Sequence, residues 1–358
     1  MPGMTVYGAT KAVLESLTRT WAAEFAESNV RVSAVAPGPM RTSKVVAAVG
    51  PDIGGMSLAA ALERISDPAE VPHVIAFVVS GRASCMTGAI VAADGGRTAI
   101  RGDPRRDRTM DRLTGKHALI TGGTSGIGLE TAREFLAEGA TVAITGRSQE
   151  KLDEAARQLD GPLLTIASDA GDVPGQAALA ARLQEEWPKL DILMSNAADV
   201  THLPIEAWTE EAFDRLLATN LKSPFFLIRD LLPLFSQQSS VILVGSVSAY
   251  IGHENATVYG AAKAGLLSYT RGLTHELKDR GIRVNGLSPG PTITNAFAPL
   301  GPERQAALYE ELRRTVPLHR LGTATELAKA AVYLASDESA YTAGTVLRVD
   351  GGIGQLAY

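Results

Sequence analysis

The sequence has little of what marks several kinds of protein. It contains one cysteine, Cys85, in 358 residues, which excludes an internal disulfide framework and suits a reducing compartment. Asp and Glu outnumber Lys and Arg, for a formal net charge of −5, whereas a nucleic-acid partner would favour a basic surface. No cluster of His, Cys and Asp stands out in the sequence, so we expect no metal site.

Long apolar runs are also missing. No stretch approaches the roughly 20 apolar residues that a membrane-spanning helix needs, and the run from Val74 to Val79 reads as part of a buried helix. The first residues, MPGMTVYGATK, lack the basic-then-apolar order of a signal peptide. We therefore expect a cytoplasmic protein whose partners include neither a membrane nor a nucleic acid. The 45% of hydrophobic and 20% of charged residues are typical of a globular protein that buries a core.

One stretch of the sequence occurs twice. VYGATKAVLESLTRTW begins at Val6, and VYGAAKAGLLSYTRGL begins 252 positions later at Val258. Further along, two DGG triplets begin at Asp94 and Asp350, which are 256 positions apart. So many matches in the same order indicate an internal repeat rather than chance.

We interpret residues 1–97 as a partial copy of residues 253–352, residues 98–112 as a charged linker, and residues 113–358 as a complete domain. In the copy we expect helices at about Tyr7–Ser28 and Pro68–Val79, and strands at Arg31–Ala36 and Ala89–Ala93. Two parallel strands alone would expose apolar faces. We therefore expect the copy to dock on the complete domain, in place of part of a neighbouring subunit. The alternatives are a missing upstream half, or a natural start at Met110.

From Leu113 onward, short apolar runs alternate with helical stretches. The strand candidates are HALIT, TVAIT, LLTIAS, DILMS, VILVGS, IRVNGLS and TVLRV. Continuous apolar strands separated by helices indicate a parallel sheet covered on both faces. The expected fold is therefore a doubly wound α/β fold, a Rossmann-like arrangement of three layers, which binds ligands beyond the carboxyl ends of its strands.

A glycine-rich turn, in ALITGGTSGIGLETA, lies between a predicted strand and a predicted helix. Gly122, Gly126 and Gly128 would let the backbone approach a pyrophosphate, and the helix N-terminus offers unpaired N–H groups. At the end of the next strand stands Arg147, where an acidic residue would select NAD(H). Because an arginine can pair with a 2′-phosphate, the sequence favours NADP(H), with NAD(H) as the alternative.

Tyr259 and Lys263 are four positions apart and share one face of a helix. A free tyrosine has a pKa of about 10, and a nearby ammonium favours the phenolate. We therefore expect Lys263 to lower the pKa of Tyr259, which can then exchange a proton with a carbonyl or alcohol oxygen. Ser246, 13 positions before Tyr259, would polarise that oxygen. Ser248 is the nearby competitor for this role.

Taken in order, these motifs resemble the short-chain dehydrogenase/reductase family, and the resemblance covers residues 113–358. It implies hydride transfer between a nicotinamide and a ketone or secondary alcohol, and a homo-oligomer, either a dimer or a tetramer. The catalytic residues it implies are Asn220, which would anchor a water near Lys263, with Ser246, Tyr259 and Lys263. The cofactor-binding residues are Gly122, Thr124, Ser125, Gly126, Ile127, Gly128, Arg147, Ser148, Asp169, Asn196, Ala197, Tyr259, Lys263, Pro289, Gly290, Thr292 and Thr294.

The same resemblance makes the stretch 294–322 a cover over the substrate. Its apolar residues indicate a partly apolar ketone or alcohol without identifying it; they are Phe297, Leu300, Leu308, Tyr309, Leu312 and Val316. A lone histidine is more often structural, so we leave His202 and His253 outside the expected site.

The rival hypothesis is a non-catalytic dinucleotide-binding scaffold with the half-copy as its interaction module. The intact set of four catalytic residues favours the enzyme. Only six residues precede Tyr7, so the copy has no serine 13 positions before it, and we do not expect it to catalyse.

Overall fold

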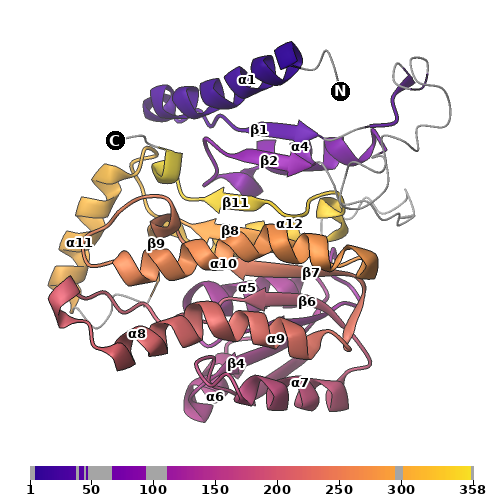
Figure 1. Ribbon diagram of the computed structural model, residues 1–358, viewed down its shortest axis with the longest axis vertical. Coiled ribbons are helices and arrows are strands. Elements are labelled where there is room, and N and C mark those ends of the chain that lie inside the picture. Colours follow the sequence, from indigo (N-terminus) through magenta and orange to yellow (C-terminus); the bar gives the residue numbers. More distant parts are fainter. Residues whose placement is uncertain are drawn as a thin grey trace.

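The computed structural model describes residues 5–37, 40–43, 46, 67–93, 111–294 and 301–355. Within them, a seven-stranded parallel sheet has the order β11-β8-β7-β6-β3-β4-β5 (Figure 1). Its strands are β3 (His117–Ile120), β4 (Thr141–Gly146), β5 (Leu163–Ala167), β6 (Leu190–Ser195), β7 (Phe235–Val244), β8 (Arg283–Pro289) and β11 (Val346–Val349). The predicted doubly wound α/β fold is confirmed.

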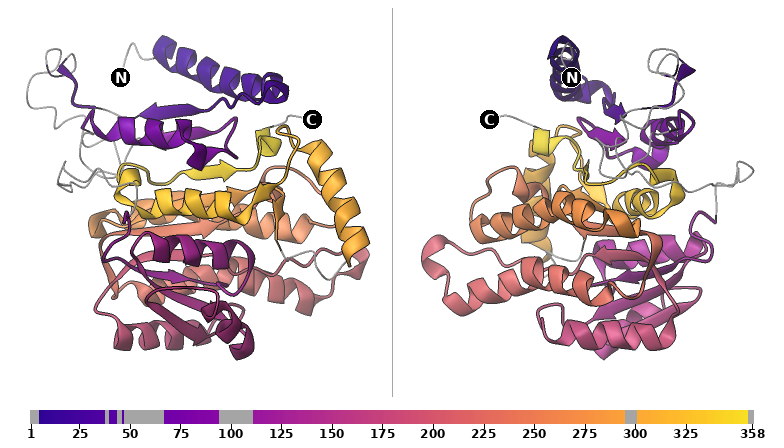
Figure 2. Two further views of the ribbon diagram at one scale, coloured as in Figure 1. Left: turned by 180° about the vertical axis from the view of Figure 1, so that it is seen from behind. Right: turned by 45° about the vertical axis from the view of Figure 1, so that its right-hand side comes forward.

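Helices cover both faces of this sheet (Figure 2). One face carries α5 (Gly126–Ala137), α6 (Gln149–Ala156) and α12 (Ala324–Ala335), which share a core with the strands. The other face carries α7 (Gly175–Glu186), α9 (Ser223–Leu231) and α10 (Thr257–Glu276) around a second core. Because both faces are covered, all six residues of β6 are buried, and its sequence LDILMS shows an apolar run rather than alternation.

The remaining elements lie between or beyond these layers. A π-helical turn at Ala218–Lys222 joins α8 (Glu210–Leu217) to α9. The short strands β9 (Thr292–Ile293) and β10 (Gly322–Thr323) pair on either side of α11 (Pro302–Thr315). No helix in the described ranges combines the length and the apolar character that crossing a membrane requires.

The N-terminal part contains α1 (Thr5–Glu24), β1 (Ala34–Pro37), α4 (Glu70–Val79) and β2 (Ile90–Ala93). These are the predicted two helices and two strands, although β1 begins later than expected. The two strands pair in parallel as a separate sheet, and β2 lies beside β11, the edge strand of the main sheet (Figures 1 and 2). The DGG triplet that begins at Asp94 lies outside the described residues, as do Met110 and most of the linker.

The contact between the N-terminal part and the main sheet is apolar at its centre. Val74 and Phe77 of α4 are buried in the same core as α12. The ring of Phe77 stacks on the ring of Tyr333, with 4.2 Å between the ring centres and 4° between the planes. Near the rim, Arg82 forms an ion pair with Glu338 at 3.4 Å. The N-terminal part and α12 therefore share one hydrophobic core.

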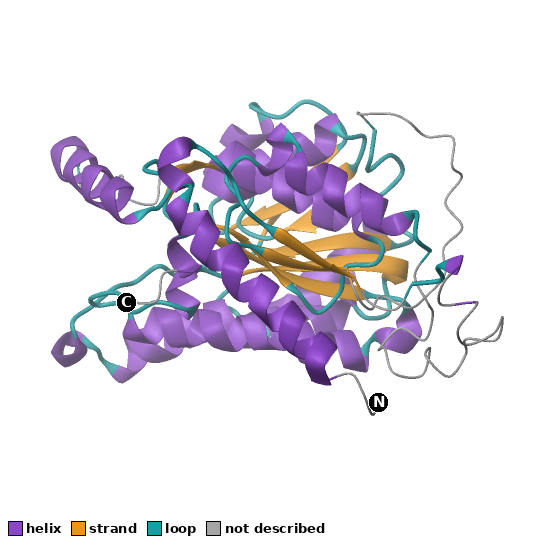
Figure 3. Ribbon diagram, turned by 90° about the horizontal axis from the view of Figure 1, so that it is seen from above, coloured by secondary structure: helices purple, strands orange, loops and turns teal. Residues whose placement is uncertain are grey.

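Helix α1 buries far fewer of its apolar side chains than α4 does. Viewed from above, it crosses over the strands at the top of the molecule (Figure 3). Val13, Leu14 and Trp21 are all more than a third exposed, although Thr18 and Ala22 on the same helix are buried. The helix thus carries an exposed set of large apolar residues.

We predict that Phe77→Ala lowers the free energy of unfolding by about 3–5 kcal/mol, because it leaves a cavity against Tyr333. The matched control is Val79→Ala on the same helix, whose side chain is 71% exposed and which should change stability by less than about 0.5 kcal/mol. Urea denaturation followed by circular dichroism measures both. Equal effects from the two variants would contradict the shared core.

Candidate functional site

The predicted site residues follow the carboxyl ends of neighbouring parallel strands, which meet at one edge of the sheet. The glycine loop follows β3, Arg147 follows β4 and Asn196 follows β6. Ser246 comes after β7, and Gly290 comes after β8. The parallel direction of the strands therefore brings segments that are far apart in the sequence to a single edge.

The glycine loop requires its glycines. Gly122 and Gly126 have φ values of +66° and +56°, in the left-handed region that favours glycine. A Cβ on Gly122 would lie 2.9 Å from Cα of Ala197, and one on Gly128 would lie 2.3 Å from the carbonyl oxygen of Gly122. At Gly126 the nearest atom would be 3.5 Å away, on Thr294. The loop is therefore tightly packed at Gly122 and Gly128, whereas a Cβ at Gly126 would only come into van der Waals contact with Thr294.

Side-chain hydrogen bonds hold this loop in shape. The hydroxyl oxygen of Thr121 accepts from the backbone N–H groups of Asn196 at 3.0 Å and Ala197 at 3.1 Å. The amide of Asn196 donates to the carbonyl oxygens of Thr121 at 3.0 Å and Gly122 at 3.1 Å. Asn196 and Ala197, which the sequence predicts as cofactor contacts, therefore hold the glycine loop in place through these hydrogen bonds.

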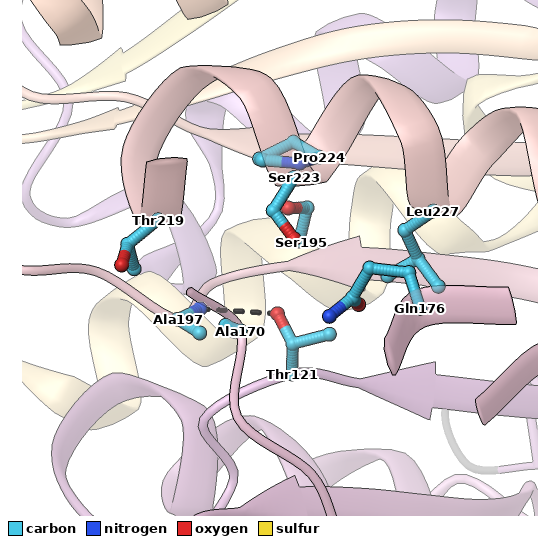
Figure 4. A pocket seen from close by; sticks show the side chains of 9 residues that line it. All are labelled: Thr121, Ala170, Gln176, Ser195, Ala197, Thr219, Ser223, Pro224 and Leu227. Atoms are coloured by element: carbon cyan, nitrogen blue, oxygen red, sulfur yellow. Dashed lines mark hydrogen bonds between the residues drawn. The ribbon is translucent and has the colours of Figure 1, made fainter. Parts of the chain in front are cut away.

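A small cavity lies behind the glycine loop, between the ends of β3 and β6 and the start of α9 (Figure 4). It is lined by Thr121, Ala170, Gln176, Ser195, Ala197, Thr219, Ser223, Pro224 and Leu227. None of the four predicted catalytic residues lines this cavity. We therefore do not assign it to the substrate.

Three predicted cofactor residues surround the first turn of α5. Ser125 precedes the helix and is exposed, and Ile127 within it is half-buried against the core. A Cβ on Gly146 would lie 2.6 Å from the Thr124 side chain, so Thr124 packs against the end of β4. The turn that follows β3 therefore packs against the end of the neighbouring strand β4.

Three further predicted contacts lie at the ends of β4 and β5. Arg147 is exposed, and in the ranges that the structure describes its guanidinium has no recorded ion pair or hydrogen bond. Ser148 caps α6 by accepting from the Lys151 N–H at 3.3 Å. The carboxylate of Asp169 is exposed and accepts from the N–H of Gly171 at 2.8 Å. Arg147 therefore offers a cation with no competing anion.

The loop after β8 is braced from two sides. A Cβ on Gly290, the residue after Pro289, would lie 2.6 Å from Cα of Asp350, so the two turns are in close contact. The hydroxyl of Thr292 donates to the carbonyl oxygen of Gly290 at 2.9 Å, and Tyr309 of α11 donates to the carbonyl oxygen of Thr294 at 3.1 Å.

The predicted lining of the substrate cover is only partly described. Phe297 and Leu300 lie outside the described residues. On α11, Leu308 and Leu312 are half-buried. Val316 just beyond that helix is buried.

Tyr259 and Lys263 lie one turn apart on α10, and the Lys263 nitrogen is 5.8 Å from the centre of the Tyr259 ring. Lys263 is only 2% exposed. Its Nζ donates to the carbonyl oxygen of Val244 at 2.8 Å. Burial disfavours the ammonium and lowers the pKa of Lys263 to about 8.

The pKa of Tyr259 moves in the direction opposite to the predicted one. Burial raises it, and a hydrogen bond with Ser246 only partly offsets that effect. The expected lowering by Lys263 was wrong for this structure, because desolvation of the phenolate dominates. The neutral phenol is the form that can donate a proton.

Ser246 rather than Ser248 acts on the phenol of Tyr259, whose pKa it lowers in part, and its own hydroxyl donates to the hydroxyl of Ser248 at 3.3 Å. The Ser246 hydroxyl oxygen also accepts from the Ser248 N–H at 3.2 Å, which caps the short helix η5 (Val247–Ala249). The same serine therefore serves as a local cap and as a neighbour of Tyr259.

Asn220 lies in the π-helical turn and is 1% exposed. Its side-chain oxygen accepts from the N–H of Asp199 at 2.8 Å, and its amide donates to the carbonyl oxygen of Asp199 at 2.7 Å. Asn220 therefore ties the loop after β6 to the start of α9. Its predicted role in anchoring a water near Lys263 stays a prediction.

Two histidines that the sequence analysis left out lie beside this group. The ring centre of His202 is 5.1 Å from that of Tyr259, and His253 is close enough for His202 to lower its pKa. Their positions in the sequence could have indicated this: His202 is in the loop after β6, and His253 lies between Ser246 and Tyr259. In the described part of the chain, no group of three or more His, Cys, Asp or Glu residues is placed to hold a metal ion.

The chain is similar to several known proteins. A family model described as enoyl-(acyl carrier protein) reductase matches residues 1–98 and 122–354. Oxidoreductase asL5 of Sarocladium schorii is 36% identical over 249 residues, which cover 69% of this chain and 99% of that protein. The uncharacterized short-chain type dehydrogenase/reductase y4vI of Sinorhizobium fredii is 30% identical over 371 residues, which cover 98% of this chain and 67% of that protein.

Further similarities are to a plant enzyme and to a solved structure. Glucose and ribitol dehydrogenase of Daucus carota is 34% identical, over 68% of this chain and 87% of that protein. A solved structure from Beutenbergia cavernae with NADP bound at low occupancy is 31% identical with a TM-score of 0.61, over 67% of this chain and 97% of that chain. The family model matches most of this chain, which therefore belongs to the short-chain dehydrogenase/reductase family of NAD(P)-dependent oxidoreductases.

Proposed function

We propose that this enzyme transfers a hydride between NADP(H) and a ketone or secondary alcohol, with Tyr259 as the general acid and base. One observation carries the proposal. Ser246, Tyr259 and Lys263 come together at the same sheet edge as the glycine loop, with Ser246 close enough to lower the pKa of the phenol and with the lysine buried one turn away. This is the arrangement that carbonyl reduction requires.

The residues present fit a dinucleotide. The glycine loop and the N-terminus of α5 would hold the pyrophosphate, because the first turn of a helix offers N–H groups that have no partner within the helix. Arg147 would pair with the 2′-phosphate of NADP(H), because it is exposed at the end of β4. The cofactor supplies the hydride.

The chain's own side chains would handle the proton. During reduction Ser246 and Tyr259 both donate hydrogen bonds to the substrate oxygen, and Tyr259 gives up its proton. During oxidation the phenolate of Tyr259 accepts a hydrogen bond from the alcohol and takes its proton. The Lys263 ammonium then stabilises the phenolate. A pKa of about 8 lets Lys263 exchange protons near neutral pH. Asn220 would hold the water that connects Lys263 to the solvent.

We further propose that residues 1–97 are a partial repeat of the same fold that does not catalyse. In support, Ala34 pairs with Ile90 between β1 and β2, and Gly286 pairs with Val346 between β8 and β11. These are the same two positions of the repeat, 252 and 256 residues later. The local pairing is therefore alike in both halves.

The contact with α12 supports docking in place of a neighbouring subunit. Phe77 stacks on Tyr333, and Arg82 pairs with Glu338. In each pair the two residues are 256 positions apart, so each meets its own counterpart in the repeat. Such self-matching contacts are characteristic of a two-fold interface. The predicted homo-oligomer would then use another face, since this one is covered.

The docked part also reaches the segments around the site. Ser84 donates to the carboxylate of Glu326 at 2.8 Å, and Arg320 donates to the Ser84 carbonyl oxygen at 3.4 Å. The carbonyl oxygen of Cys85 accepts from the N–H of Gly351 at 3.2 Å. These contacts support the start of α12 and the turn that packs on Gly290.

For the catalytic role, we predict that Tyr259→Phe lowers kcat by about 10²–10⁴-fold, because it removes the proton donor. A panel of ketones and alcohols, with NADPH followed by its absorbance, measures the rate, and NADPH fluorescence checks that the cofactor still binds. Tyr269→Phe on the same helix is the matched control and should retain the wild-type kcat. An active Tyr259→Phe enzyme would rule out this acid and base.

For the cofactor preference, we predict that Arg147→Ala raises KM for NADPH by about 10–100-fold, the size expected for a hydrogen bond to a charged group. KM for NADH should change by less than about threefold, because NADH lacks the 2′-phosphate. Arg157→Ala, also an exposed arginine on this side of the sheet, is the control. A parallel loss with both cofactors would contradict the assignment.

For the N-terminal part, we predict that a chain beginning at Met110 is less stable than the full chain and self-associates, because it uncovers Tyr333 and the rest of the α12 face. Thermal unfolding and size-exclusion chromatography with light scattering measure both effects. If this shorter chain is as soluble, as stable and as active as the full chain, the docking role is wrong.

A further inference from the structure

We propose that Ser84 is a positioning residue for the substrate cover, the stretch 294–322, so that the half-copy takes part in substrate binding. Ser84 does not itself touch the substrate. It acts through Glu326, which holds one end of the cover. The inference rests on the proposed function, because it takes this stretch as the cover of the substrate.

The two ends of the cover lie side by side. Strands β9 and β10, which flank α11, pair in parallel, with Thr292 opposite Gly322. The N–H of Gly322 also donates to the carbonyl oxygen of Pro291 at 2.9 Å. A contact that fixes the segment around Gly322 therefore fixes both the point where the cover leaves the sheet edge and the point where it returns.

Glu326 anchors the returning end of the cover. Its carboxylate accepts from the Thr323 N–H at 2.9 Å, which caps α12, and from the guanidinium of Arg320 at 2.6 Å and 3.0 Å. Burial raises the pKa of Glu326, but hydrogen bonds from Arg320, Thr323 and Ser84 outweigh that effect and hold it at about 2. The carboxylate is therefore ionised at neutral pH and stays a strong acceptor.

Ser84 completes this group from the N-terminal part. Its hydroxyl donates to Oε1 of Glu326 at 2.8 Å, the same oxygen that accepts the shorter bond from Arg320. Arg320 also donates to the Ser84 carbonyl oxygen at 3.4 Å. Ser84 therefore bonds to both partners of the ion pair and restricts the carboxylate to the orientation that Arg320 needs.

The repeat separates this contact from the contacts that the fold itself requires. Glu70, 256 positions before Glu326, keeps the capping contact, since it accepts from the Asp67 N–H at 2.9 Å. The counterpart of Ser84 is Ala340, which has no hydroxyl. The hydroxyl contact therefore runs only from the half-copy to the complete domain, unlike the self-matching pairs at the centre of the interface. We infer that the serine serves the site of the complete domain.

The backbone next to Ser84 holds the cover at a second point. The carbonyl oxygen of Cys85 accepts from the N–H of Gly351 at 3.2 Å, and the carbonyl oxygen of Gly351 accepts from the N–H of Leu318 at 3.3 Å. These bonds use no side chain, so they persist when Ser84 is replaced. A change at Ser84 should therefore loosen the cover without releasing the N-terminal part.

The test uses the full chain with three substitutions. Ser84→Ala removes the hydroxyl, and Ser84→Thr restores one. The matched control is Ser80→Ala, because the Ser80 hydroxyl bonds within the N-terminal part: it donates to the carbonyl oxygen of Phe77 at 2.7 Å and accepts from the Arg82 N–H at 3.2 Å. The measurements are KM and kcat for cyclohexanone, heptan-2-one and acetophenone with NADPH, and amide hydrogen exchange of residues 301–322 by mass spectrometry.

We expect Ser84→Ala to raise KM for the ketone about three- to tenfold, as the loss of one hydrogen bond predicts. Its kcat should be unchanged, because the cover contributes to binding and not to the proton transfer. Amide exchange in residues 301–322 should become faster, because the cover opens more often. Ser84→Thr should recover most of both changes. Ser80→Ala should lower Tm but leave KM and the exchange of this range at the wild-type values.

Wild-type KM and exchange in Ser84→Ala, or equal changes in Ser80→Ala, would overturn the role of Ser84 and leave the proposed function standing. Faster exchange without a rise in KM would also contradict it, because the segment would then not cover the substrate. If the wild type reduces none of the three ketones, the proposed function loses its support, whereas the exchange measurement still decides whether Ser84 holds this segment.

Discussion

Parallel strands deliver their carboxyl ends to one edge of a sheet, and everything that we assign to the site depends on this constraint. Residues as distant as Thr121 and Thr294 lie at that edge because β3 and β8 run in the same direction. Cross-links then fix the loops relative to one another, Thr121 with Asn196 and Asn220 with Asp199. The sheet brings the loops together, and these hydrogen bonds determine their distances.

Burial sets the electrostatics of the proton-transferring group. It lowers the pKa of Lys263 and raises that of Tyr259, and both shifts favour the neutral forms. The carbonyl oxygen of Val244 compensates part of the desolvation of Lys263. The raised pKa therefore keeps the phenol of Tyr259 protonated, in the form that can donate a proton.

The fold was predictable from the sequence, because apolar runs between helical stretches leave few alternatives to a parallel sheet. The site residues at the edge of the sheet were predictable from the order of the motifs. The tertiary contacts of these residues were not. The support that Asn196 gives to the glycine loop, the upward pKa shift of Tyr259 and the contact of His202 with Tyr259 depend on tertiary packing. Local pattern does not encode burial: Leu14 and Trp21 are exposed, whereas Leu266 and Leu273, 252 positions later, are buried.

The stacking of Phe77 on Tyr333 also has a consequence for biosynthesis. The two residues are 256 positions apart, so the first is made long before the second leaves the ribosome. At roughly 5–20 residues per second, synthesis of the intervening chain takes on the order of 10 to 50 seconds. Throughout this interval Phe77 and Val74 lack the partner that buries them, so the nascent chain leaves them exposed. The order of the two halves along the gene thus makes the earliest segment the last to complete its packing.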